Sequence, residues 1–110
     1  MFKPDLRLKR IYDTYNRKFF DNALPHDTRV GWNDELEGYA LTIGIDDEES
    51  KHRIFVVYIN PNFHSEVEQY RLSLLHECIH IKLYPYMKHG RKFDEEILRL
   101  ASRGALKGIL

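Results

Sequence analysis

The sequence lacks the features that mark secreted, membrane-spanning or disulfide-bonded proteins. Its one cysteine, Cys78, excludes a disulfide within the chain and suits a reducing compartment. The longest apolar run covers residues 54–59, which is far too short to cross a bilayer. The opening segment MFKPDLRLKR contains no apolar signal-peptide core. We therefore expect a cytoplasmic protein that makes no membrane contact.

A net charge of either sign is also missing, since 17 basic residues balance 17 acidic ones. This balance argues against a protein held to nucleic acid by bulk charge alone. The bases are nevertheless concentrated at the two ends: residues 1–18 hold six bases and two acids, and residues 82–110 hold seven bases and three acids. Solvated helix surfaces are the simpler interpretation. The alternative is a basic face, which predicts weak DNA binding through these terminal segments.

Apolar residues make up 43% of the 110 residues, which is enough for one hydrophobic core. Repeats, low-complexity tracts and linkers are absent, so we expect a single domain over residues 1–110 that acts as a monomer. Periodic apolar spacing predicts three helices, and β-branched and aromatic runs predict three strands. The expected order is a helix at 5–22, strands at 28–32, 39–45 and 53–59, and helices at 65–84 and 93–103. This order predicts an α+β fold with helices packed on a small three-stranded sheet.

Local signals set the ends of the two later helices. Ser65 followed by Glu68 fits a capping box at the start of the second helix, and Pro85 prevents its continuation. Gly104 is expected to end the third helix. The expected apolar side of that helix comprises Ile97, Leu98, Leu100 and Ala101.

The second predicted helix contains His76-Glu77-Cys78-Ile79-His80, which is the motif HExxH. Residues four apart lie on the same helix face, so His76 and His80 can direct ring nitrogens at one metal ion. Glu77 lies about 100° around the helix from His76, which places its carboxylate beside the ion rather than on it. This arrangement is typical of a zinc site that activates water next to a carboxylate base. Cys78 lies on the far side of the helix, and we interpret it as a buried apolar residue.

Two hydrogen-bonded core histidines are the simpler alternative for His76 and His80. The helix around them is apolar on two sides, which marks it as internal, and histidine without a ligand is an unusual choice there. The flanking apolar residues are Leu72, Leu75, Ile79 and Leu83 on one side and Leu74, Cys78 and Ile81 on the other. We expect the histidines at positions 26, 52 and 64 to lie in solvated loops.

A two-histidine site needs a third protein ligand. The metzincin pattern, with a histidine six residues after the second one, is excluded because Tyr86 occupies that position. A thermolysin-like site would use Glu95 or Glu96 from the next helix. Alternatively, His89 returns to the metal after the second helix ends, aided by the backbone freedom of Gly90. We expect His89, because the helix dipole already accounts for acidic residues near the start of a helix.

Further motifs accompany HExxH along the chain. They are Tyr15-Asn16, Phe19-Phe20, Leu24-Pro25, Val30, Trp32, Gly38, Ile59-Asn60-Pro61, Leu74-Leu75 directly before HExxH, and His89-Gly90-Arg91-Lys92-Phe93. In this combination the chain resembles the SprT-like metallopeptidases, the family of bacterial SprT and eukaryotic Spartan, over about residues 11–103. The resemblance implies a zincin-like fold, zinc held by His76, His80 and His89, and Glu77 as the catalytic acid/base. Eukaryotic members cleave proteins crosslinked to DNA with the help of DNA-binding segments outside the catalytic core, and this chain lacks the cysteines of the zinc ribbon that many relatives carry.

These features predict a zinc-dependent endopeptidase that hydrolyses peptide bonds with metal-activated water, one zinc ion per chain and Glu77 as general acid/base. The expected substrate is a protein or extended peptide, with DNA-associated proteins as a candidate class. The alternative is a non-catalytic, zinc-stabilised module that binds protein or DNA, although a purely structural site needs no carboxylate such as Glu77. A metal-dependent nuclease is a third hypothesis. The residue that would stabilise an oxyanion stays open among Tyr84, Tyr86 and Arg91.

Overall fold

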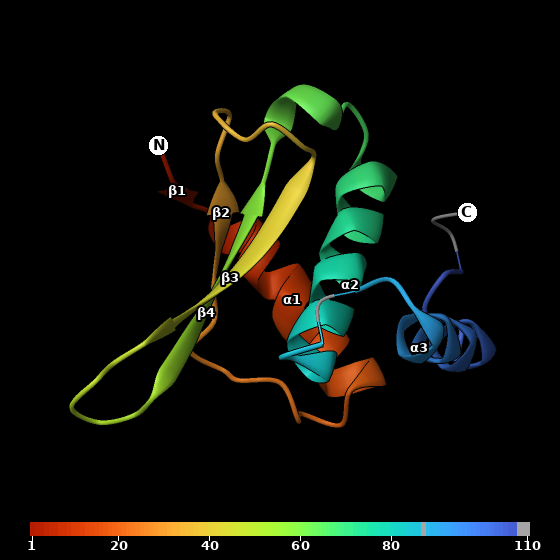
Figure 1. Ribbon diagram of the computed structural model, residues 1–110. Helices are drawn as coiled ribbons and strands as arrows, with labels where there is room; N and C mark the ends of the chain where they lie inside the picture. The colour runs from red at the N-terminus through yellow and green to blue at the C-terminus, as the bar shows by residue number, and fades with distance from the viewer. Residues whose placement is uncertain (87, 108–110) are drawn as a thin grey trace.

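The computed structural model describes residues 1–86 and 88–107. In chain order these form β1 (Lys3–Pro4), α1 (Leu6–Phe19), β2 (Arg29–Trp32), β3 (Ala40–Asp46), β4 (Arg53–Ile59), a short 3₁₀ turn (Pro61–Phe63), α2 (Val67–Leu83) and α3 (Arg91–Ser102). Helices α1 and α2 pack against the sheet, and α3 lies beside α2 on the side away from the strands (Figure 1). Within this described part of the chain, no helix is both long and apolar enough to span a membrane.

The sheet contains four strands in the order β1-β2-β4-β3, in which β2 and β4 pair in parallel and the other neighbours pair antiparallel. This confirms the α+β class, but the predicted three-stranded sheet was wrong because it omitted β1. A strand of two residues, one of them Pro4, carries no period-two pattern that a sequence could reveal. The pairing of β1 depends on Gly31, where a Cβ atom would lie only 2.3 Å from the main-chain oxygen of Lys3.

Helix α1 packs one face against the core, so its buried residues recur at three- and four-residue steps. They are Leu8, Tyr12, Tyr15 and Asn16. Asp5 caps the first turn and also accepts a hydrogen bond from the indole N–H of Trp32 at 3.0 Å. The helix ends at Phe19, three residues earlier than predicted, because Asp21 and Asn22 adopt φ angles of 52° and 59°, outside the right-handed helical region.

Helix α2 runs through the interior, as its apolar pattern predicts. Nine of its 17 residues are buried: Tyr70, Ser73, Leu74, Leu75, Glu77, Cys78, Ile79, His80 and Ile81. The capping box predicted from Ser65 and Glu68 was wrong by one residue, since Glu66 is the N-cap. The side-chain oxygen of Gln69 accepts hydrogen bonds from the main-chain N–H groups of Ser65 and Glu66 at 2.6 and 3.1 Å. A glutamine three residues after Glu66 therefore does what the glutamate was expected to do.

Helix α3 contacts α2 through a face that matches the predicted one only in part: Leu100 is buried and Ile97 half-buried, as expected. Its buried residues are Phe93, Glu96 and Leu100. Leu98 is 69% exposed and Ala101 is also exposed, so their assignment to the apolar side was wrong. The error is one of helical phase, because a step of one residue turns a side chain by about 100°. Gly104, with a φ of 84°, follows the last helical residues and confirms the predicted end.

Candidate metal centre

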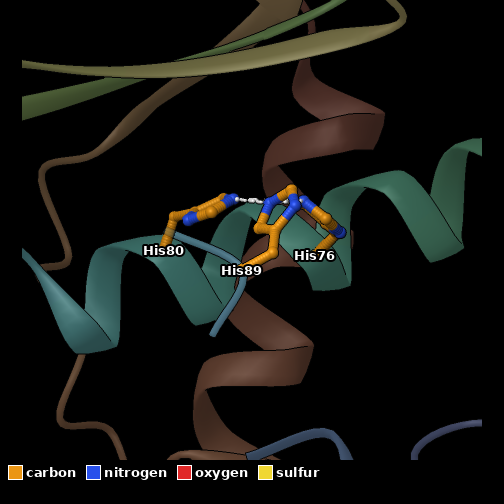
Figure 2. A group of neighbouring side chains, drawn as sticks. All are labelled: His76, His80 and His89. Carbon is orange, nitrogen blue, oxygen red and sulfur yellow. Dashed lines mark hydrogen bonds between the residues drawn. The ribbon is translucent and has the colours of Figure 1, made fainter. Parts of the chain in front are cut away.

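Three histidines converge beside helix α2. His76 and His80 lie one turn apart on that helix, and His89 reaches them from the segment between α2 and α3 (Figure 2). Their Nε2 atoms are 3.1 Å apart for His76 and His80, 3.0 Å for His76 and His89, and 2.9 Å for His80 and His89. The structure therefore brings together the three side chains that the sequence selected, and the group can hold a metal ion.

The donor set fits a metal ion better than it fits a hydrogen-bonded cluster. Three nitrogens bound tetrahedrally at about 2.0–2.1 Å are about 3.3 Å from one another, close to the separations found here. A ring nitrogen carries either one N–H or one lone pair in the plane of the ring, so it cannot point at two partners at once. Mutual hydrogen bonds therefore cannot account for all three contacts.

The local environment keeps two of these rings in the form that metals bind. Burial, together with the adjacent His80 and His89 rings, lowers the pKa of His76 to about 4. Burial and His89 likewise lower the pKa of His80. Both rings are then neutral at pH 7 and offer a lone pair. The Nδ1 atom of His80 is buried without a hydrogen-bond partner among the described residues, so an ion on Nε2, rather than a protein group, would fix its tautomer.

The residues around the three imidazoles form an apolar support on one side. The ring of Phe93 in α3 lies 4.8, 5.3 and 4.7 Å from the rings of His76, His80 and His89, measured between centroids. This contact explains how α3 holds the His89 segment near α2.

Gly90 has a φ of −107°, which other residues adopt readily, so the backbone freedom expected there is not needed. Met87, within the return segment, lies outside the described residues.

Glu77 lies beside the histidine trio and is not part of it. Its side chain is buried, and one oxygen accepts a hydrogen bond from the Thr42 hydroxyl at 2.8 Å. The other oxygen lies 3.9 Å from Nε2 of His76. Burial raises the pKa of Glu77 to about 7, although the Thr42 hydrogen bond opposes the rise. A carboxyl that titrates near neutral pH is suited to accept and return a proton.

A cleft of about 310 Å³ opens over this group, between β3 and α2. It is lined by His76, Glu77, His80, His89 and a run from Gly38 to Thr42. A larger cavity of about 470 Å³ lies between the start of α1 and β2, but its lining contains no cluster of metal-ligating side chains. We therefore place the site in the smaller cleft, where the chemically competent side chains are.

The competing ligands predicted from the sequence lie elsewhere. Glu96 is buried and accepts hydrogen bonds from Lys82 at 2.7 Å and from Arg99 at 2.8 Å. Glu95 is exposed and pairs with Arg91. Neither glutamate belongs to the metal-binding group. The role of Glu96 is thus to tie α3 to α2, which the helix dipole alone did not predict.

None of the three residues considered for oxyanion stabilisation lines the cleft. Tyr84 packs against Phe55 and Arg53 on another face, Tyr86 packs under Lys92, and Arg91 pairs with Glu95. Tyr39 and Thr42 line the cleft instead, and neither was predicted from the sequence. Nothing in the local sequence marks these two residues, because the way β3 packs against α2 brings them to the site.

The remaining predicted positions divide into two groups. Cys78 is fully buried, as expected, and does not belong to the group that can hold a metal ion. His26 and His52 are exposed, also as expected. His64 was wrongly placed in solvent, since it is half-buried and hydrogen-bonded to Ser73 at 2.7 Å.

Comparison with known proteins adds no relative. No protein-family model, curated protein or solved structure matches the chain. The resemblance to SprT-like metallopeptidases therefore stays a prediction drawn from the motifs, and the site itself is the basis for proposing a function.

Proposed function

We propose that this chain is a zinc-dependent endopeptidase with a zincin-like fold of the SprT-like type. The observation that carries the proposal is the convergence of three histidine nitrogens within 3.1 Å of one another, with a buried carboxyl beside them. Imidazole nitrogens suit zinc, and three protein ligands leave one coordination position open, as catalytic zinc sites require. His76, His80 and His89 would hold the ion.

When bound, zinc would supply a Lewis acid that polarises a carbonyl and lowers the pKa of water. The protein residues would handle the proton. Glu77, facing the trio at 3.9 Å from His76, would accept a proton at its free oxygen and return it to the leaving amine. Thr42 would keep the other oxygen occupied, so that one face of the carboxylate is presented to the reactants.

An extended peptide is the substrate that the cleft favours. Strand β3 is an edge strand, so among the described residues the main-chain groups on its outer side have no neighbouring strand. Part of β3 also lines the cleft. A peptide added along this edge would run past the metal trio with its main chain hydrogen-bonded to β3. We further propose that the protein acts as a monomer in the cytoplasm.

The burial of Glu77 distinguishes an enzyme from a zinc-stabilised binding module. A buried carboxyl without a cationic partner destabilises a fold, and among the described residues Glu77 contacts no Lys or Arg. A site that only stabilised structure would gain nothing from this carboxyl. Three histidines around a metal ion would also be compatible with a metal-dependent nuclease. The edge strand β3 favours a peptide substrate over a nucleic acid.

A DNA-linked role would depend on a different surface. Arg7 and Arg10 from α1 and Arg71 from α2 line a hollow of about 280 Å³. None of the three forms a salt bridge with an acid of the described residues, so they are available to phosphate groups. Basic residues of the C-terminal segment are less available to phosphate groups, because several of them, including Arg91 and Arg99, form ion pairs with acidic side chains.

The decisive experiment compares zinc-loaded parent protein with Glu77→Gln on casein and on labelled RNA. Glutamine keeps the size of the side chain and removes the base, so zinc content should persist while kcat/KM on casein falls by a factor of about 10² or more. Equal activity of the two proteins would refute the role of Glu77. Cleavage of RNA but not casein would favour the nuclease.

A further inference from the structure

A second pocket adjoins the cleft over the metal trio. It has a volume of about 260 Å³ and is lined by Tyr39, Leu72, Ser73, Leu75, His76 and Ile97. Tyr39 and His76 also line the cleft, so the two hollows adjoin at these side chains. A peptide bond lying at the metal trio would therefore place a flanking side chain at the mouth of this pocket.

We propose that this pocket binds an uncharged apolar side chain, of about leucine size, from the substrate residue next to the cleaved bond. The inference rests on the proposed peptidase function and adds its specificity. The pocket is smaller than the 300 Å³ or so at which sites for whole small molecules begin, so it suits one side chain. Its aliphatic lining comes from two helices, with Leu72 and Leu75 on α2 and Ile97 on α3.

The polar atoms of the pocket explain why a charged side chain would be excluded. Nδ1 of His64 lies 2.7 Å from the main-chain oxygen of Asn60, which only accepts, so Nδ1 carries the hydrogen. Nε2 of the same ring is hydrogen-bonded to the Ser73 hydroxyl at 2.7 Å. The Ser73 hydroxyl is thus already hydrogen-bonded to His64. No charged side chain of the described residues lines the pocket, so a lysine or glutamate there would lose its hydration without a counter-charge.

The wall on α3 offers a way to change the pocket without touching the metal ligands. Ile97 is half-buried and belongs to no hydrogen-bond or ion-pair network of the described chain, so replacing it should preserve the fold. Ile97→Trp should fill the pocket, and Ile97→Ala should enlarge it. The adjacent Leu98 is 69% exposed and does not line the pocket. Leu98→Trp and Leu98→Ala are therefore matched controls on the same helix.

The test combines cleavage-site mapping with a binding measurement that needs no turnover. A peptide library digested by zinc-loaded parent protein should show Leu, Ile, Met or Phe enriched at one position flanking the cleaved bond, and Ile97→Trp should shift that position to Gly or Ala. In parallel, calorimetry should show acetyl-leucine hydroxamate binding the zinc-loaded protein about tenfold more tightly than acetyl-glycine hydroxamate. The norleucine hydroxamate should likewise bind more tightly than the lysine hydroxamate. Ile97→Trp should abolish the leucine preference, and Leu98→Trp should keep it.

The outcomes separate this inference from the proposed function. Cleavage with no preference at either flanking position, or with a preference unchanged in Ile97→Trp, would overturn the pocket assignment and leave the peptidase standing. Absence of cleavage by the parent protein would refute the peptidase. The hydroxamate series then decides the pocket alone, since equal affinity for the leucine and glycine compounds would overturn it.

Discussion

Replacing Glu96 by glutamine tests how helix α3, and with it the segment that carries His89, is held on α2. Burial by itself would raise the pKa of Glu96, but hydrogen bonds from Arg99 and Lys82 outweigh it, so the pKa lies below its usual value. The carboxylate side chain is 8% exposed, whereas those of Lys82 and Arg99 are 36% and 31% exposed. The carboxylate thus loses most of its hydration, while both cations keep part of theirs.

The partial exposure of Lys82 and Arg99 determines how much unfolding free energy the substitution should cost. Breaking a fully buried pair costs about 3–5 kcal/mol, and breaking an exposed pair costs about 1 kcal/mol or less. Glu96→Gln should fall between these limits, at about 2 kcal/mol of unfolding free energy. For a chain of about this length each kcal/mol lowers Tm by about 4 °C, so we expect a drop of about 8 °C.

Thermal unfolding followed by circular dichroism, with a chelator present to remove any stabilisation by metal, measures this drop. The pKa of Glu96 is lower in the folded state than its ordinary value of 4.5. The difference in Tm between the variant and the parent protein should therefore be largest above pH 4.5 and should shrink as the pH falls through the folded-state pKa. Glu95→Gln, which breaks the exposed pair with Arg91, is the matched control and should change Tm little. A drop below about 1 °C for Glu96→Gln, or one that does not shrink in acid, would refute the reasoning.

Two further predictions concern catalysis and DNA. Thr42→Val removes the hydrogen bond that lowers the pKa of Glu77, so the acid limb of the pH profile of kcat/KM should move to higher pH. A hydrogen bond to a charged group contributes about 1.5 kcal/mol, which corresponds to a move of about one pH unit. An acid limb at the same pH as in the parent protein would show that Thr42 does not tune Glu77. Fluorescence anisotropy should detect salt-sensitive binding of single-stranded DNA at low salt, weakened in Arg7→Gln/Arg10→Gln/Arg71→Gln and largely retained in Arg103→Gln/Lys107→Gln. No binding by the parent protein at low salt would leave a peptidase without a DNA-linked role.

The sequence predicted the meeting of the three histidines well because its key constraint is local. The spacing of His76 and His80 is fixed by the helix repeat, and the apolar residues around them predict that the helix is internal. His89 could be favoured because helix-dipole chemistry accounted for the competing glutamates. Glu96 is also buried between Lys82 and Arg99, which gives it a structural role between α3 and α2. No local sequence pattern predicted this role.

The parts that were missed depend on contacts between distant segments. Strand β1 exists because Gly31 leaves space for Lys3, and Thr42 meets Glu77 because β3 packs against α2. The exposed position of Leu98 follows from the phase of α3, which is set by where Phe93 meets the histidine rings. Composition and periodicity can predict that longer elements such as β3 and α3 exist, but tertiary packing decides their phase and partners.

The central claim, that His76, His80 and His89 hold one zinc ion, is tested most directly by zinc titration against a competing chromophoric chelator. The parent protein, His89→Ala and Glu96→Ala should be measured side by side at pH 7. We expect one tightly held zinc per parent chain, a large loss of zinc affinity in His89→Ala, and zinc retained by Glu96→Ala. Zinc held equally well by His89→Ala, together with its loss from Glu96→Ala, would contradict the three-histidine site.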